Sequence, residues 1–181
     1  GIVGIIGLGN AGSAIASAFA ASGEVHGYDQ NASRRDDAAG KGIITHDHLG
    51  GVASRADVII LSLPHPDISI AVTTQIMAQR IRPKLVIETS TVTPQTAIDC
   101  AALAAAKNVG FVDAAIAGGV ASMETGLDHR TDALLALASE PVKDLMAYKH
   151  YEGGVTTSRV GAETGFAFTR RRLGCYCVPA A

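Results

Sequence analysis

The stretch Gly1-Ile2-Val3-Gly4-Ile5-Ile6-Gly7-Leu8-Gly9-Asn10-Ala11-Gly12 decides the fold of this chain. Its first part, Ile2–Ile6, is an apolar run typical of a strand that is buried on both faces. Three glycines then have the spacing G-x-G-x-x-G, and an Ala-rich helix is predicted over Ala11–Ser22. In this pattern the first glycine allows a tight turn, the second lets the backbone approach a pyrophosphate, and the third lets the helix pack against the strand. The residues predicted to hold a dinucleotide are Gly7, Leu8, Gly9, Asn10, Ala11 and Gly12.

An acidic residue follows the glycine loop at the distance that dinucleotide binding requires. Asp29 comes directly after the second predicted strand, Glu24–Tyr28, about twenty residues beyond the loop. Its carboxylate can accept hydrogen bonds from ribose hydroxyls and would repel a 2′-phosphate, which favours NAD as the cofactor. Arg34 and Arg35 follow closely and could serve a 2′-phosphate, so NADP is the alternative. The same two arginines also fit a solvated turn of mixed charge.

Short apolar strands alternate with Ala-rich helices, which predicts an α/β fold with a Rossmann-type, doubly wound and mostly parallel sheet. The further predicted strands are Val58–Ser62, Leu85–Glu88, Phe111–Asp113 and Leu134–Ala138, with a weaker one at Gly42–Thr45. The further predicted helices are Ser33–Ala39, Ile68–Arg80, Pro94–Lys107 and one from about Pro141 to Tyr148. We expect the dinucleotide-binding domain to cover residues 1–160. Residues 161–181 are expected to be the start of an interdomain helix or an aberrant tail.

Composition argues against several classes of function. Charged residues make up 18% of the 181 residues and the net charge is -2, so nothing indicates a nucleic-acid partner. No apolar run approaches the ~20 residues that a membrane helix needs, and no membrane partner is expected. The three cysteines, Cys100, Cys175 and Cys177, form no disulfide framework, and reduced thiols are typical of a cytoplasmic protein. His46 and His48 have no further ligand at useful spacing, so no metal is expected.

Four motifs in order give the chain a family resemblance over about Gly1 to Gly165. The glycine loop resembles the opening of the β-hydroxyacid dehydrogenases, the group of the 3-hydroxyisobutyrate and 6-phosphogluconate dehydrogenases. Leu63-Pro64 follows the predicted strand Val58–Ser62, where the Leu-Pro of that family lines the cofactor. The stretch Glu88-Thr89-Ser90-Thr91-Val92-Thr93-Pro94 resembles its D-x-S-T-x-x-P loop. The stretch Asp113-Ala114-Ala115-Ile116-Ala117-Gly118-Gly119 resembles its D-A-P-V-S-G-G substrate loop.

The resemblance implies roles for single residues. Leu63, Pro64 and Thr91 would contact the cofactor, and Ser90 with Gly118 and Gly119 would bind the substrate. The residues agree with this reading, because hydroxyls at the carboxyl end of a strand and bare glycine amides can both bind a carboxylate. Two simpler readings stay open: hydroxyls that cap the helix after Pro94, which Thr93 alone could do, and a plain turn at the two glycines.

The sequence also departs from the family. Ala115 and Ala117 replace a Pro and a Ser of the substrate loop. The register of the catalytic lysine falls on Arg171, and arginine cannot pass a proton as a lysine of lowered pKa can. Cys175 stands where the family has an Asn one helical turn later. We further expect the family's all-helical C-terminal domain to be missing from this sequence.

These observations imply an NAD(P)-dependent oxidoreductase that transfers a hydride between nicotinamide and a small hydroxyacid or semialdehyde. Two alternatives remain: a dinucleotide-binding fragment without turnover, and an enzyme of the imine reductase type. The expected partner is a small anionic hydroxyacid, and a homodimer is compatible with the sequence.

Overall fold

The strands of this protein lie in one sheet, in the order β3-β2-β1-β4-β5-β6-β7. The computed structural model describes residues 1–115 and 176–179. The strands are β1 Val3–Ile6, β2 Val25–Tyr28, β3 Ile44–Thr45, β4 Val58–Leu61, β5 Leu85–Glu88, β6 Gly110–Ala115 and β7 Tyr176–Pro179. The helices are α1 Asn10–Ala20, α2 Ala32–Ala39, α3 Leu49–Ala53, α4 Pro66–Ala78 and α5 Pro94–Ala105.

Six strands are parallel and the sheet is doubly wound. β1 pairs with β2 on one side and with β4 on the other, so the chain reverses its direction of winding between β1 and β4. The parallel order continues through β5 and β6. β7 pairs antiparallel with β6, with Ala114 opposite Cys177. The expectation of a mostly parallel, Rossmann-type α/β sheet is confirmed.

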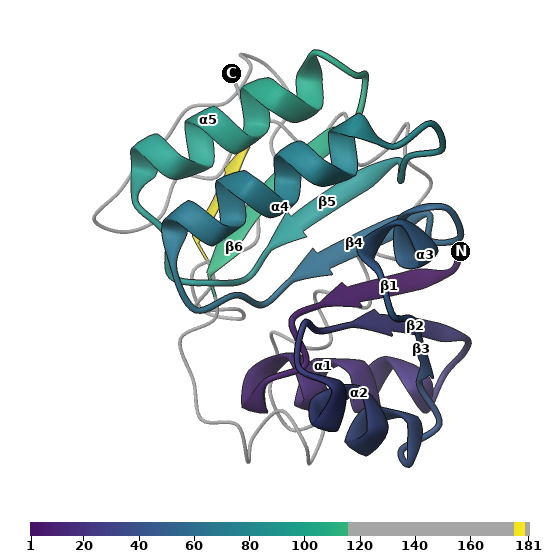
Figure 1. Cartoon of the computed structure of the whole chain (residues 1–181). Coiled ribbons are helices and arrows are strands. Elements are labelled where there is room, and N and C mark those ends of the chain that lie inside the picture. The colour runs from purple at the N-terminus through teal and green to yellow at the C-terminus, as the bar shows by residue number, and fades with distance from the viewer. Residues whose placement is uncertain (116–175, 180–181) are drawn as a thin grey trace.

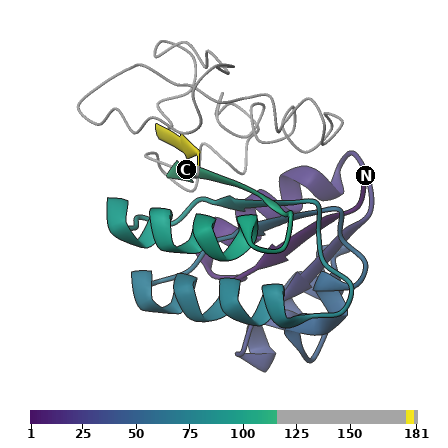
Figure 2. The ribbon, with the colours of Figure 1, turned by 90° about the horizontal axis from the view of Figure 1, so that it is seen from above.

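Helices cover both faces of the sheet and bury two hydrophobic clusters. α4 and α5 lie side by side on one face, and α1 lies on the opposite face (Figures 1 and 2). The first cluster joins Ile15 and Phe19 of α1 to alternate residues of the strands, such as Ile5 and Ile60. The second joins α3, α4 and α5 to the other set of strand residues, such as Ile59. Because both faces are covered, the strands are apolar throughout, as their sequence predicts.

Besides shifts of one or two residues at other element ends, the structure differs from the expected elements as follows. Leu49–Ala53 forms the short helix α3, which was not expected because five residues with two glycines have little intrinsic helix preference. α4 begins at Pro66, two residues before the expected start, because proline is tolerated in a first helical turn. Tyr176–Pro179 forms a strand within the segment expected to be a helix or tail. The expected strand Leu134–Ala138 and the expected helix from Pro141 to Tyr148 lie outside the described residues.

Candidate functional site

Three loops meet at the carboxyl ends of β1, β4 and β5. These strands are parallel neighbours, so the loops that leave them lie along one edge of the sheet, where ligands bind in open α/β sheets (Figure 1). The loop after β1 holds the three glycines, the loop after β4 holds Leu63 and Pro64, and the loop after β5 holds Ser90 and Thr91. The sequence assigned the cofactor to these loops, and the fold brings them together.

Two of the glycines are required by the close packing of the loop itself. Gly7 has a φ of 94°, and a Cβ there would lie 2.0 Å from the carbonyl oxygen of Ser62. A Cβ on Gly12 would lie 1.8 Å from the carbonyl oxygen of Gly7. Neither carbonyl oxygen can move away without a shift of the backbone. Gly7 therefore makes the turn, and Gly12 lets α1 approach the end of β1.

Gly9 has a different reason to be a glycine, because its surroundings are open among the described residues. A Cβ built on Gly9 would meet only the guanidinium of Arg34, at 3.8 Å. Gly9 stands directly before α1, where the amides of Asn10 and Ala11 have no carbonyl acceptor within the helix. The free side of this loop thus combines unpaired N–H groups, the positive end of a helix dipole and a nearby cation. These features fit a pyrophosphate.

Asp29 ties the glycine loop to the end of β2. It is 5% exposed, and its Oδ2 accepts a hydrogen bond from the Leu8 amide at 2.8 Å. Its Oδ1 accepts one from the Asn31 amide, also at 2.8 Å. The Leu8 side chain is buried in the core, and the Leu8 amide donates to Asp29. Leu8 therefore has only its carbonyl left to contact a cofactor.

The two arginines after β2 have separate roles. Arg35 donates to the backbone carbonyl of Asp29 at 2.7 Å, so it holds the turn. The Arg34 side chain is 54% exposed and its Nη1 lies 3.4 Å from Asp29 Oδ2. Arg34 is therefore the arginine of this pair that has a free side for a phosphate.

The loops after β4 and β5 are joined by Ser90. Its Oγ accepts a hydrogen bond from the Leu63 amide at 2.7 Å. Thr89 adds a second link, because its Oγ1 donates to the Leu61 carbonyl at 2.6 Å. Ser90 is buried, whereas Pro64 and Thr91 are exposed. The Leu63 amide fixes the position of Ser90, and the Ser90 hydroxyl also interacts with the Glu88 carboxylate.

The capping alternative for Ser90 and Thr91 is settled by Thr93. The Thr93 side chain accepts from the Thr96 amide at 3.1 Å and caps α5, and Pro94 takes the first helical position. Ser90 and Thr91 therefore do not cap α5. Gly118, Gly119 and Arg171 lie outside the described residues, so their roles stay predictions.

A buried carboxyl pair lies just inside this edge and was missed by the sequence reasoning. Glu88 ends β5, is 0% exposed and is the register partner of Asp113 in β6. Burial raises the pKa of Glu88. Burial and then the neighbouring Glu88 carboxylate raise the pKa of Asp113 to about 7. The sequence signal that could have indicated this pair is that Glu88 and Asp113 each end a predicted strand, and that these two strands are consecutive in the sequence.

A histidine of β2 and the histidine that follows β3 also interact in a way that the sequence did not reveal. His26 Nδ1 lies 2.8 Å from His46 Nε2, and the two rings stack. Burial, followed by the charge of His26, lowers the pKa of His46. The His48 ring accepts from the Gly51 amide and caps α3. In the part of the chain that the structure describes, no group of three His, Cys, Asp or Glu residues is placed to hold a metal.

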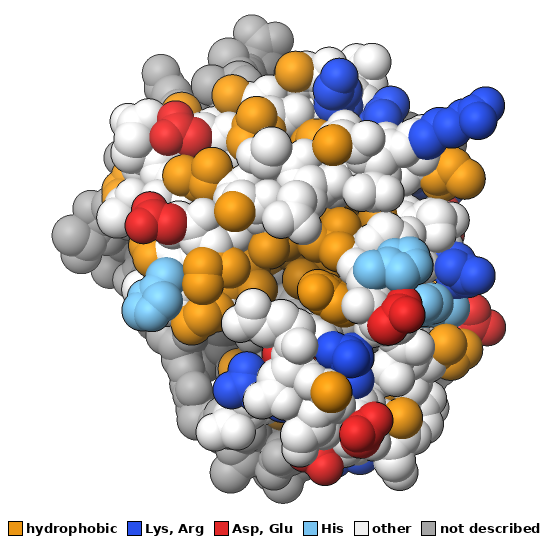
Figure 3. Space-filling view, viewed as in Figure 1, with side chains coloured by type: hydrophobic (Ala, Val, Ile, Leu, Met, Phe, Trp, Pro, Cys, Tyr) orange, Lys and Arg blue, Asp and Glu red, His pale blue; other side chains and the backbone are white. Residues whose placement is uncertain are grey.

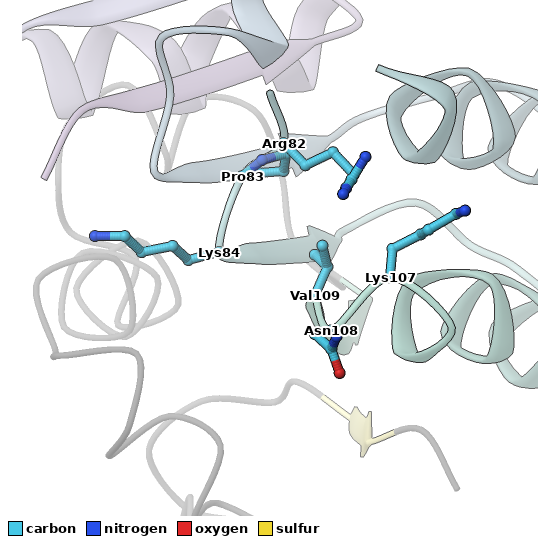
Figure 4. A pocket seen from close by; sticks show the side chains of 6 residues that line it. All are labelled: Arg82, Pro83, Lys84, Lys107, Asn108 and Val109. Atoms are coloured by element: carbon cyan, nitrogen blue, oxygen red, sulfur yellow. The ribbon is translucent and has the colours of Figure 1, made fainter. Parts of the chain in front are cut away.

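A second hollow, of about 280 Å³, lies at the opposite edge of the sheet and is lined by Arg82, Pro83, Lys84, Lys107, Asn108 and Val109 (Figure 4). Two of its three cations already have partners. Lys84 Nζ lies 2.9 Å from Asp57, and Arg82 donates to the Gln79 carbonyl. The face that carries α4 and α5 shows a further shallow hollow with hydrophobic side chains (Figure 3). No helix among the described residues is long and apolar enough to cross a membrane.

The sheet order, the glycine turn and the acid after β2 together define a Rossmann-type dinucleotide-binding domain. Comparison with known proteins gives the family. Residues 2–127 match the family described as the NAD binding domain of 6-phosphogluconate dehydrogenase, and the chain belongs to that family. The expected resemblance to the β-hydroxyacid dehydrogenases is thereby confirmed.

Individual relatives agree with this assignment. The mitochondrial 3-hydroxyisobutyrate dehydrogenase of Drosophila melanogaster is 29% identical over 124 residues, which are 67% of this chain and 38% of that protein. The Mycobacterium tuberculosis 3-hydroxyisobutyrate dehydrogenase solved with L-serine has a TM-score of 0.65 at 28% identity, over 68% of this chain and 43% of that one. An imine reductase of Myxococcus stipitatus in complex with NAD+ has a TM-score of 0.57 at 22% identity, over 67% and 42%, and shows the fold alone. The chain spans less than half the length of these relatives.

Proposed function

We propose that this chain forms the cofactor-binding part of an NAD(P)-dependent oxidoreductase of the β-hydroxyacid dehydrogenase type. The observation that carries the proposal is the open space at Gly9, in a loop whose other two glycines are fixed by packing. A residue whose Cβ would meet nothing closer than 3.8 Å has no need to be glycine for folding. Close approach of a bulky anion, such as a pyrophosphate, to the backbone would explain why this residue is a glycine.

We propose NAD as the preferred cofactor. Asp29 places a negative charge beside the glycine loop, and it would repel a 2′-phosphate. Arg34 is the residue that supports the alternative, NADP, because half of its side chain is exposed next to Asp29. The bound nicotinamide would supply the hydride, and the protein would orient it and keep water away. Thr91, Leu63 and Pro64 are proposed to contact the cofactor.

For the substrate we propose a small hydroxyacid or its semialdehyde. Ser90, which the Leu63 amide holds in place, and the glycines Gly118 and Gly119 would bind the carboxylate. The names of the fly and mycobacterial relatives, both 3-hydroxyisobutyrate dehydrogenases, support this class of substrate. Arg171 is proposed to hold a charge in the register of the family lysine. The domain of residues 1–160 and the separate segment 161–181 also remain proposals.

The test of cofactor binding is an NADH titration followed by fluorescence. We expect measurable affinity for the natural sequence and a loss of at least tenfold, about 1.4 kcal/mol, in Gly9→Val, because the valine side chain fills the path of the pyrophosphate. The matched control is Gly23→Val, since a Cβ at Gly23 meets nothing within 4 Å. Equal affinity of the natural chain and Gly9→Val, with both folded, would remove the pyrophosphate assignment.

Two points of cell biology are proposals of the same kind. Cys100 is a buried free thiol, which supports a reducing compartment such as the cytoplasm. The name of the fly relative places that protein in the mitochondrion, so the organelle is the alternative. A homodimer is proposed as the assembly, and its mass in solution would test it.

A further inference from the structure

The cofactor edge of the sheet has a buried acidic layer beneath it. Glu88 and Asp113 are register partners on the parallel strands β5 and β6, so their side chains project from the same face of the sheet. Glu88 is 0% exposed and Asp113 is 7% exposed. Among the described residues, one oxygen of each carboxyl, Glu88 Oε2 and Asp113 Oδ1, has no hydrogen-bond partner. Because both carboxyl groups are buried and each has an unpaired oxygen, we consider the protonation of the two groups together.

The groups around the pair bring no positive charge. From α4 the neighbours are the hydroxyls of Ser69 and Thr73, which are themselves buried and without a partner. From α5 the neighbour is the Cys100 thiol, whose pKa is raised by burial and by three acids, Glu88, Asp99 and Asp113. Within the described residues, the shifts of the two carboxyls have no Lys, Arg or His among their causes. Two uncompensated carboxylates in such a site repel each other strongly.

The two carboxyls differ in what donates to them. Glu88 Oε1 accepts from the Ser90 amide at 2.8 Å, and the Ser90 and Ser69 hydroxyls and the Thr89 amide also favour its charged form. The Ser69 hydroxyl faces Glu88 but lies outside hydrogen-bonding geometry, so we count it as a weak neighbour. Asp113 has only the Ala115 amide to favour its charged form. The negative charge therefore belongs on Glu88 and the proton on Asp113.

We propose that Glu88 and Asp113 carry one negative charge between them and that this charged pair positions the two loops at the nicotinamide end of the cofactor site. Asp113 stands opposite Glu88 in the register of β5 and β6. Glu88 Oε1 accepts from the Ser90 amide, and Ser90 Oγ accepts from the Leu63 amide at 2.7 Å. This series of neighbours crosses β6, β5 and β4 in turn. Glu88 and Asp113 are positioning residues, since they act through Ser90. The assignment of these loops to the nicotinamide end rests on the proposed function.

The pair makes the structure sensitive to pH, and the sign follows from the direction of the shift. Asp113 has a pKa of about 7 in the folded chain, above its ordinary value of 3.8. The folded state thus holds a proton that the unfolded state has lost between these values. The stabilisation is complete below pH 3.8 and is lost as the pH rises through about 7. Above that pH both carboxyls are charged and repel each other across the sheet.

The test is a carboxyl ¹³C and backbone amide NMR titration of the full chain, without cofactor. We expect one side-chain carboxyl, assigned to Asp113 by its backbone correlations, to titrate with a pKa of about 7. The amides of Ser90 and Leu63 are expected to shift with the same midpoint. In Glu88→Gln the Asp113 midpoint is expected to fall, because the neighbouring charge is gone. Asp47→Asn is the matched control, since that side chain is 86% exposed and remote from the pair.

Each result decides the proposal. An Asp113 midpoint near its ordinary value, or one that Glu88→Gln leaves unchanged, would overturn the shared charge. Stationary amides at Ser90 and Leu63 would overturn the positioning role. If Glu88→Gln does not fold, the carboxyl and amide titrations of the natural chain still decide both parts. Because no cofactor is present, a failure of NADH to bind would count against the proposed function and leave this inference standing.

Discussion

At the scale of single residues, Asp29 has two roles that its position in the sequence does not separate. It was predicted from its distance to the glycine loop as a ribose ligand. The structure adds a structural role, since both of its oxygens accept backbone amides and one of these belongs to Leu8. A carboxylate oxygen has a second lone pair, so a ribose hydroxyl can still be accepted. Any substitution of Asp29 therefore changes cofactor choice and loop stability together.

We expect the natural chain to bind NADH more tightly than NADPH. In Asp29→Ala the difference in affinity between the two nucleotides is expected to become smaller. The physical reason is the loss of repulsion against the 2′-phosphate, next to the cation of Arg34. Titration of both nucleotides into the same preparation measures the ratio. Arg34→Ala is the companion variant, and it is expected to weaken NADPH further. A natural preference for NADPH would mean that Arg34 dominates and that our reading of Asp29 is wrong.

At the scale of elements, the loop from β5 to α5 holds two exposed threonines, of which Thr93 caps the helix and Thr91 does not. We expect Thr93→Ala to lower the free energy of unfolding by about 1 kcal/mol, because α5 loses its N-cap. Thr91 is exposed, and Thr91→Ala is expected to change stability by less than about 0.5 kcal/mol while it weakens NADH binding. Urea unfolding and NADH titration of the two variants give the comparison. Equal effects of both variants on both measurements would contradict the division of roles.

The sequence predicted the elements whose signals are local. The β1–α1 turn and the Thr93 cap each depend on a few consecutive residues, and both are confirmed. α3 was missed because its stability comes from burial and from the His48 cap rather than from intrinsic preference. The carboxyl pair was missed because Glu88 and Asp113 are joined only by the register of two strands. Contacts of this kind arise from tertiary packing, which periodicity does not encode.

At the scale of the whole molecule, cofactor binding and turnover make different demands. Binding uses the loops of one sheet edge, which this chain supplies. Turnover also needs a proton relay and a site closed to water. We propose that Arg171 stands in the register of the family lysine, and an arginine stays protonated and cannot relay a proton. The matched part of the relatives is less than half of their length.

We therefore expect the 181-residue chain to bind NADH but to oxidise 3-hydroxyisobutyrate or 6-phosphogluconate at least ~100-fold more slowly than a full-length relative. A steady-state assay over hydroxyacids and cyclic imines, with the relative as positive control, measures this. Selective turnover of an imine would favour the imine reductase alternative. Turnover of a hydroxyacid on the order of ~10 s⁻¹ would contradict the prediction and mean that another residue replaces the lysine.

The ties that hold the glycine loop have a consequence for the speed of association. The Gly7 amide donates to the Tyr28 carbonyl at 2.9 Å and the Leu8 amide donates to Asp29, so these two bonds fix the shape of the loop without a ligand. A ligand that meets a preformed site needs no slow rearrangement, and its capture is then limited by encounter. In stopped-flow mixing, the observed rate should rise in proportion to the nucleotide concentration, in a single phase and without a plateau. Asp29→Ala releases the Leu8 amide, and a plateau in that variant alone would reveal the ordering step that the natural chain has completed on folding.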